Sequence, residues 1–151
     1  MLLSLLASNA GCQVRGSAQD QAVESAPGIE GYVVRQEAGG ILVVAPDREA
    51  IWFDSAPSKA RVGQKVQVWY GESRESYPAQ ATAERVTIVL SSKPAGADLS
   101  EADAVRAALV GYEAAMAPAV QRAEYDASSD TWSVRIQGDD GGESVEQVKD
   151  E

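Results

Sequence analysis

The stretch "QKVQVWYGESRESYPAQATAERVTIVL", from Gln64 to Leu90, decides the fold. Apolar and polar residues alternate in its first part. In an extended strand this alternation places the side chains of Val66, Val68 and Tyr70 on the same face. The alternation returns in its last part with Val86, Ile88 and Leu90. Strict alternation over short segments is typical of strands that bury one side. The stretch therefore predicts two strands, 64–71 and 84–90, with residues 71–83 connecting them.

The connection contains a Tyr-Pro pair directly before the second strand. Pro78 has no N–H to donate, so it belongs just outside the ladder of backbone hydrogen bonds. The proline also favours an extended conformation at Tyr77. We therefore expect the Tyr77 ring to lie across one end of the sheet while its hydroxyl reaches a polar partner.

Three more strand patterns precede this stretch, over Ile29–Gln36, Ile41–Pro46 and Ala50–Ser55. "AGG" at 38–40 reads as a hairpin turn, and Pro46-Asp47 closes the second run. Five short strands over residues 28–92, without a helix pattern among them, indicate a mainly β domain that forms a small barrel. Barrels of the OB type and SH3-like barrels both fit this pattern.

The segments "IEGYVV", "ILVV", "IWF", "VGQKVQVWYG" and "ESYPAQATAERV" follow one another in this order. Together they resemble the YobA-like family of small secreted proteins in Gram-positive bacteria, from Gly28 to Leu90. The most specific part of the match is Ser76–Gln80. The resemblance implies a predicted lipoprotein with a domain of unknown function, and it supplies no catalytic residues.

The aromatic residues of the barrel allow two interpretations. Loops between the strands of OB-type barrels bind ligands, so a sugar- or peptide-binding face is possible. Its candidate residues are Trp52, Trp69, Ser76, Tyr77 and Gln80. In the alternative, Trp69 and Tyr70 cap opposite sides of one strand, and Tyr77-Pro78 is a packed structural corner.

Catalysis and metal binding are disfavoured by composition. The chain has no histidine, which excludes Ser-His-Asp and Cys-His nucleophilic sites and the zinc sites that need imidazole. One cysteine forms neither an internal disulfide nor a Cys-rich metal site. Nothing in the sequence fixes the separation of the carboxylates of Asp54, Glu72 and Glu75. We expect a protein that is not an enzyme and has no cofactor and no metal.

The formal net charge is −10, and acidic residues are concentrated after residue 92. Such a surface repels phosphate backbones, so nucleic acid is not an expected partner.

The first residues, "MLLSLLASNAGC", contain an apolar run over Leu2–Ala7, small residues and then the lone Cys12. This order is typical of a bacterial lipoprotein signal, in which the cysteine is acylated, for example with palmitate, and becomes the new N-terminus. Asn9 and the absence of a basic residue before the run depart from the pattern. A start codon assigned too far downstream would explain the missing basic residues and the short run.

Residues 13–27 are polar, rich in small residues and without periodicity, as in a flexible tether. The expected location is extracytoplasmic, with the lipid on Cys12 anchored in the cell membrane of a Gram-positive type of cell.

A second unit is predicted over residues 99–137, after a linker at 91–98. Ser100 and Asp103 have the spacing of a capping box. An amphipathic stripe follows with Ala102, Val105, Leu109, Tyr112 and Met116, and Pro118 ends the helix. A hairpin comes next, with its turn at 126–130, and one face of its second strand carries Trp132, Val134 and Ile136. We expect the helix to pack on this face in an α+β unit.

This helix–hairpin pattern resembles half of a PepSY-type module, which implies a link to peptidase inhibition and to cell-envelope proteins. The remaining residues, 138–151, predict a disordered acidic tail. Their Asp139, Asp140 and Glu143 lack the ligand spacing of an EF-hand loop.

The sequence thus favours a non-enzymatic extracytoplasmic lipoprotein that binds an envelope protein or glycan. The alternative is a regulator or inhibitor of a secreted peptidase that acts through the helix–hairpin unit.

Overall fold

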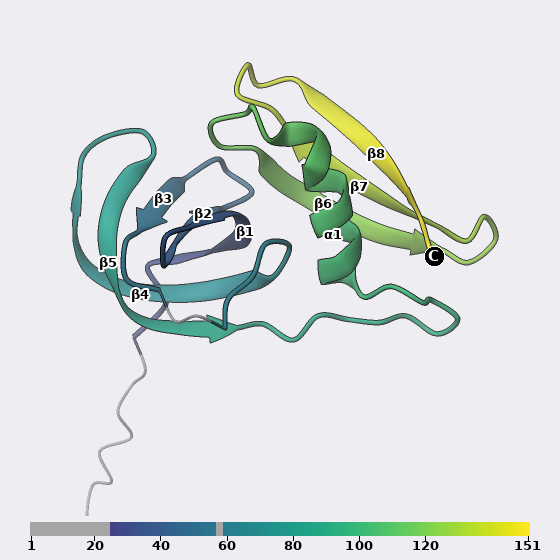
Figure 1. Ribbon diagram of the computed structural model, residues 1–151, viewed down its shortest axis with the longest axis horizontal. Coiled ribbons are helices and arrows are strands. Elements are labelled where there is room, and N and C mark those ends of the chain that lie inside the picture. Colours follow the sequence, from purple (N-terminus) through teal and green to yellow (C-terminus); the bar gives the residue numbers. More distant parts are fainter. Residues whose placement is uncertain (1–24, 57–58) are drawn as a thin grey trace, which may run out of the picture.

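The computed structural model describes residues 25–56 and 59–151 and shows a mainly β protein (Figure 1). A closed five-stranded barrel is followed by one short α-helix and a three-stranded antiparallel sheet. The helix lies against one face of this sheet (Figure 1). The predicted fold class is therefore confirmed. Cys12 and the tether before Ser25 lie outside the described residues.

The barrel contains β1 (Ile29–Glu37), β2 (Gly40–Val44), β3 (Ala50–Phe53), β4 (Lys65–Arg74) and β5 (Ala79–Ile88). Their order is β1-β2-β3-β5-β4, and β4 pairs with β1 to close the barrel. The β3–β5 pair is parallel, whereas the other pairs are antiparallel. This order, with one parallel pair, is that of an OB-type barrel and differs from that of an SH3-like barrel.

The interior of the barrel is filled by one side of each strand. Val66 and Val68 are fully buried there and Tyr70 packs against them, as the alternation predicts. Val86 and Ile88 of β5 also pack against this core. The same expectation is wrong for Leu90, which is 93% exposed because β5 ends at Ile88.

The connection between β4 and β5 is much shorter than predicted. β4 continues to Arg74 and β5 begins at Ala79, so residues 75–78 connect them instead of residues 71–83. The pairing register of β4 with β5 shifts after Trp69 and again after Tyr70. Such irregularities interrupt the alternation of inward and outward side chains. The sequence therefore loses its two-residue hydrophobic period at positions where the strands still continue. Pro78 lies just outside the ladder, as expected.

The C-terminal unit begins with α1 (Glu101–Leu109) and the 3₁₀ turn η1 (Val110–Tyr112). The Ser100 hydroxyl accepts a hydrogen bond from the Asp103 amide, and the Asp103 carboxylate accepts one from the Ser100 amide, which confirms the capping box. The predicted stripe is too long, since α1 ends at Leu109. Gly111 disfavours further helix, and Met116 lies beyond it in a loop.

The sheet of this unit contains β6 (Ala119–Asp126), β7 (Thr131–Gln137) and β8 (Glu143–Lys149) in that order. Trp132, Val134 and Ile136 are buried on one face, and α1 packs there as predicted. The prediction of a disordered tail is wrong, because β8 pairs with β7 along its whole length. Its charged side chains are suited to an edge strand, which explains the low apolar content.

Asp150, just after β8, ties the end of the sheet to the start of α1. Its buried carboxylate accepts hydrogen bonds from the amides of Asp98 and Leu99 and from the indole N–H of Trp132. Burial alone raises the pKa of a carboxyl, but here these hydrogen bonds outweigh it and lower the pKa of Asp150.

The C-terminal unit covers the outer face of the barrel over β1, β2 and β3. Leu42, Val44 and Ala50 pack there against Ala117 and Ala119. A second contact is formed by Tyr32, which packs with Val105, Leu109 and Val120. All five residues of β2 are consequently buried, with one face toward the barrel interior and the other beneath the C-terminal unit. The barrel and the C-terminal unit form one packed body.

Candidate functional site: a groove beside Trp52

Trp52 and Gln80 lie side by side on the outer surface of the barrel, as register partners across the parallel β3–β5 pair. They line a groove of about 310 Å³, in which the apolar lining also includes Leu42, Pro78 and Met116. Two charged side chains, Arg35 and Glu37 at the end of β1, complete the lining. We name this hollow the Trp52 groove.

One wall of the Trp52 groove is the loop after η1. The Arg35 guanidinium donates hydrogen bonds to the carbonyls of Ala115 (2.6 Å) and Glu113 (3.3 Å). From the other side, the Asp139 carboxylate accepts hydrogen bonds from the amides of Met116 (2.6 Å) and Ala117 (2.9 Å). The loop is therefore held by both parts of the molecule, and it presents the half-exposed Met116 to the groove.

The Trp52 ring is positioned by a close approach to the backbone of β2. A Cβ atom at Gly40 would lie 2.7 Å from the ring, so only glycine leaves room for it. The ring is half-buried, and its remaining surface contributes to the groove. Backbone packing on one side thus fixes the orientation of the aromatic ring.

Tyr77 and Ser76 belong to the connection before β5 and are not among the residues that line the groove. The Tyr77 hydroxyl donates a hydrogen bond to the carbonyl of Arg48 (3.2 Å), which is the polar partner that the sequence predicts. Its ring, however, is 51% exposed and forms only a partly packed corner. The Ser76 hydroxyl donates to the Pro78 carbonyl, and the Tyr77–Pro78 peptide is cis.

Trp69 lies on β4, which does not neighbour β3 in the barrel. Its indole N–H donates to the Ser25 carbonyl (2.6 Å), and the Arg85 guanidinium lies 3.7 Å from the ring centroid. The structure therefore brings Trp52 and Gln80 into one site and leaves Trp69 apart.

Four lining residues escaped the sequence analysis. Arg35, Glu37 and Leu42 lie on strands in which nothing in the sequence marks the outward side chains as ligand-binding. Met116 belongs to the predicted helix stripe. No local motif marks these residues, because the groove forms where β1 contacts the loop after η1. Arg35 and Ala115, which bond there, are 80 positions apart in the sequence.

The carboxylates considered for catalysis do not converge on the Trp52 groove. Asp54 and Glu72 line a separate cavity of about 230 Å³, where Asp54 accepts a hydrogen bond from the Thr82 hydroxyl. Across residues 25–56 and 59–151, no group of three or more His, Cys, Asp or Glu side chains could hold a metal ion. In the same part of the chain, no helix is long and apolar enough to cross a membrane.

The segment with the Trp52–Gln80 pair also carries a family signature. Residues 45–90 match a family of unknown function. Its description is "Protein of unknown function (DUF3221)", and the matched segment runs from the end of β2 to just beyond β5. The DUF3221 match thus includes Trp52, Pro78 and Gln80, but neither β1 nor the C-terminal unit. Searches of curated proteins and of solved structures found no match.

Proposed function

We propose that this protein is a non-enzymatic binding module that holds a neutral glycan of the cell envelope in the Trp52 groove. The observation that carries the proposal is the half-buried Trp52 ring beside the Gln80 amide on the outer face of β3 and β5. In OB-type barrels the face of strands 2 and 3, between the loops that flank it, is a common site for oligosaccharides. Here the C-terminal unit covers much of that face, and the Trp52 groove is the part left open.

The chemistry of the groove favours a sugar. An indole ring offers a flat apolar surface for the C–H face of a pyranose, and amide, carboxylate and guanidinium groups bond to its hydroxyls. Arg35 and Glu37 have opposite charges that cancel locally. The net charge of −10 disfavours anionic polymers. The volume of about 310 Å³ lies at the small end of ligand sites, which suits one or two sugar rings.

Calorimetric titration with chitotetraose, a neutral chain of N-acetylglucosamine, tests the proposal. We expect Trp52→Ala to weaken binding at least about fivefold, on the scale of the 1–3 kcal/mol or so that a base gains by stacking on an aromatic ring. Trp69→Ala is the matched control, because it removes another indole of the barrel outside the groove. Absence of heat with the wild-type protein, or equal loss with both variants, would contradict glycan binding in this groove.

The location that we propose is the outer side of the cell membrane, with the chain anchored through a lipid on Cys12. The signal-like residues 1–12, the polar stretch behind them and the resemblance to the YobA-like family support it, and the DUF3221 match lies inside the resembling segment. Mass spectrometry of protein from its native host decides the point. A mature chain that begins with a diacylated Cys12 is expected, and an unmodified Cys12 in a chain that still begins at Met1 would contradict it.

Regulation of a secreted peptidase through residues 99–137, as in a PepSY-like module, has less support. The apolar stripe of α1 and the Trp132 face are buried against each other and the barrel. A peptidase would therefore have to recognise the remaining exposed surface of this unit.

A further inference from the structure

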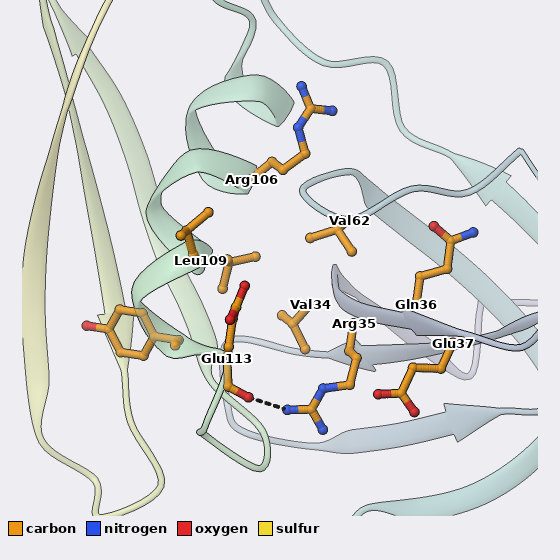
Figure 2. A pocket seen from close by; sticks show the side chains of 10 residues that line it. Val34, Arg35, Gln36, Glu37, Val62, Arg106, Leu109 and Glu113 are labelled. Atoms are coloured by element: carbon orange, nitrogen blue, oxygen red, sulfur yellow. Dashed lines mark hydrogen bonds between the residues drawn. The ribbon is translucent and has the colours of Figure 1, made fainter.

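A second hollow lies at the seam between the barrel and the C-terminal unit (Figure 2). This seam groove has a volume of about 360 Å³ and lies between the end of β1 and the last turn of α1 with η1. Its apolar lining consists of Val34, Val62, Leu109 and Val110. Figure 2 shows Val34 and Val62 on the barrel side facing Leu109 on the helix.

One edge of β1 becomes free where it borders the seam groove. β1 pairs with β4 over residues 29–32, and the last bonds on this side join Val33 to Gln64 and Gly63. Its pairing with β2, on the other edge, continues to Glu37. Among the residues that the structure describes, no backbone segment pairs with the β4-side edge of β1 beyond Val33.

The register shows which backbone groups face this free edge. A two-residue turn joins Glu37 to Gly40, so this pair exchanges the hydrogen bonds that close the hairpin. Hydrogen-bonded and non-hydrogen-bonded pairs alternate along an antiparallel ladder. Gln36 and Ile41 therefore form a non-hydrogen-bonded pair, and the N–H and C=O of Gln36 point away from β2 toward the free edge.

We propose that the seam groove binds an extended peptide, which adds as a short strand to the free edge of β1 at Val34–Glu37. Main-chain groups of the peptide bond to the N–H and C=O of Gln36, and one apolar side chain enters between Val62 and Val110. Strand addition to an open edge is an established mode of peptide recognition, in which backbone bonds supply affinity and a pocket supplies selectivity. This inference is independent of glycan binding in the Trp52 groove.

The charges around the seam groove indicate the kind of peptide. Arg35 and Arg106 are balanced by Glu37 and Glu113 in its lining, so an uncharged segment with β-branched apolar side chains fits best. The outer edge strand β8 offers a contrast, since its sequence ESVEQVK carries three charged side chains, which protect an edge from pairing. The free edge of β1 also carries two charged residues, Arg35 and Glu37, but unlike β8 it borders a hollow lined by apolar side chains.

The probe is the peptide acetyl-Thr-Val-Thr-Val-Thr-amide, titrated into ¹⁵N-labelled full-length protein. We expect amide shift changes at Val34–Glu37 and Val110. An analogue N-methylated at its three central residues keeps the side chains but loses the main-chain donors of those residues, so it should bind at least tenfold more weakly. Equal binding of both peptides, or no shift changes at residues 34–37, would overturn strand addition.

Matched variants test the groove itself. Val110 is 66% exposed, so Val110→Glu leaves the core intact while placing a charge in the apolar lining. It should weaken binding of the unmodified peptide at least fivefold. Val145→Glu on β8 is the control, since this valine is 48% exposed and is not part of the groove lining. Undiminished binding by Val110→Glu, or shift changes centred on β8, would overturn the assignment.

Discussion

The Asp139 carboxylate, in the turn between β7 and β8, accepts a hydrogen bond of 2.9 Å from the backbone amide of Ala117. Asp139 accepts a second bond from Met116, and Arg35 of the barrel holds the same loop through its carbonyls. These backbone hydrogen bonds, aided by the charges of Arg48 and Arg35, lower the pKa of Asp139. One ionised carboxylate thus helps to hold the wall of the Trp52 groove, together with Arg35.

We expect Asp139→Asn to lower the melting temperature at pH 7, with a cost of about 1 kcal/mol because the carboxylate is exposed. A lowered pKa means that the ionised form contributes stability above the ordinary value of 3.8, and that this contribution is lost as pH falls through the folded pKa. The gap between wild type and variant should therefore shrink below about pH 4. Melting curves at several pH values check this.

Asp140→Asn is the control, because Asp140 accepts a hydrogen bond from the Gly142 amide within its own turn. Hydrogen exchange at the amides of Met116 and Ala117 should quicken in the Asp139 variant and not in the Asp140 variant. Equal exchange in both would show that the loop is held by other contacts.

Gly63 and Gly39 both have positive φ angles, of 93° and 83°, but only Gly63 touches α1. A Cβ atom there would lie 2.2 Å from the Ala102 carbonyl oxygen, whereas Gly39 has nothing within 4 Å. Alanine at either site costs about 1–2 kcal/mol of backbone strain. Gly63→Ala should lose a further 1–3 kcal/mol or so, the scale of overpacking. Chemical denaturation of both variants measures the difference, and equal losses would mean that α1 shifts freely.

Removing residues 99–151 should prevent the barrel from folding as a soluble monomer. The truncation exposes Leu42 and Val44, which are buried beneath the C-terminal unit. We expect aggregation and no cooperative melt, because an exposed apolar patch of this kind promotes association. The truncated chain with Leu42→Thr and Val44→Thr should be more soluble. A sharp melt of the unmodified truncated chain would contradict this expectation.

Two neighbouring residues of β4 should differ strongly in their effect on stability. Val68 is fully buried in the barrel, so Val68→Asp places an unpaired carboxylate there and should cost more than about 3 kcal/mol. Trp69→Ala removes an outer ring that contacts Arg85 and Ser25 and should cost about 1–2 kcal/mol. Thermal melts rank the two, and the reverse order would mean that the faces of β4 are assigned wrongly.

Tyr77→Phe removes one exposed hydrogen bond to Arg48 and should cost at most about 1 kcal/mol. Because the ring is half-exposed, Tyr77→Ala should cost about 1–2 kcal/mol, less than a fully buried aromatic ring. Chitotetraose titration should give the wild-type affinity for both variants, since Tyr77 does not line the Trp52 groove. Loss of binding without loss of stability would make Tyr77 a ligand platform instead.

The barrel could be predicted because each strand carries its own signal. The alternation around Val66 and Val68 and the turn at 38–40 depend on residues close in sequence, and the structure confirms both. The strand ends could not be predicted where register shifts occur in the β4–β5 pair. β8 could not be predicted because an edge strand with charged side chains has the composition of a solvated tail. The bond that fixes its end, from the Asp98 amide to Asp150, joins residues 52 positions apart.

The candidate site could be predicted only in part. The sequence nominates both Trp52 and Gln80 as candidates. It places Gln80 in the predicted connection at 71–83 and leaves the barrel type open, so their pairing across β3 and β5 does not follow from it. Arg35 and Met116 reach the groove through contacts between the barrel and the C-terminal unit, and sequence periodicity does not encode such contacts.

The burial of β2 on both faces restricts how this barrel can be recombined with other domains in evolution. A gene that inherits the barrel segment without the C-terminal unit must either encode another cover or replace Leu42 and Val44 with polar residues. Relatives of these two kinds are therefore distinguishable from their β2 sequence alone, since a covered strand reads as a continuous apolar run and an uncovered one alternates. The apolar sequence GILVV at 40–44 thus indicates that the C-terminal unit, which begins more than 50 residues further along the chain, covers this strand.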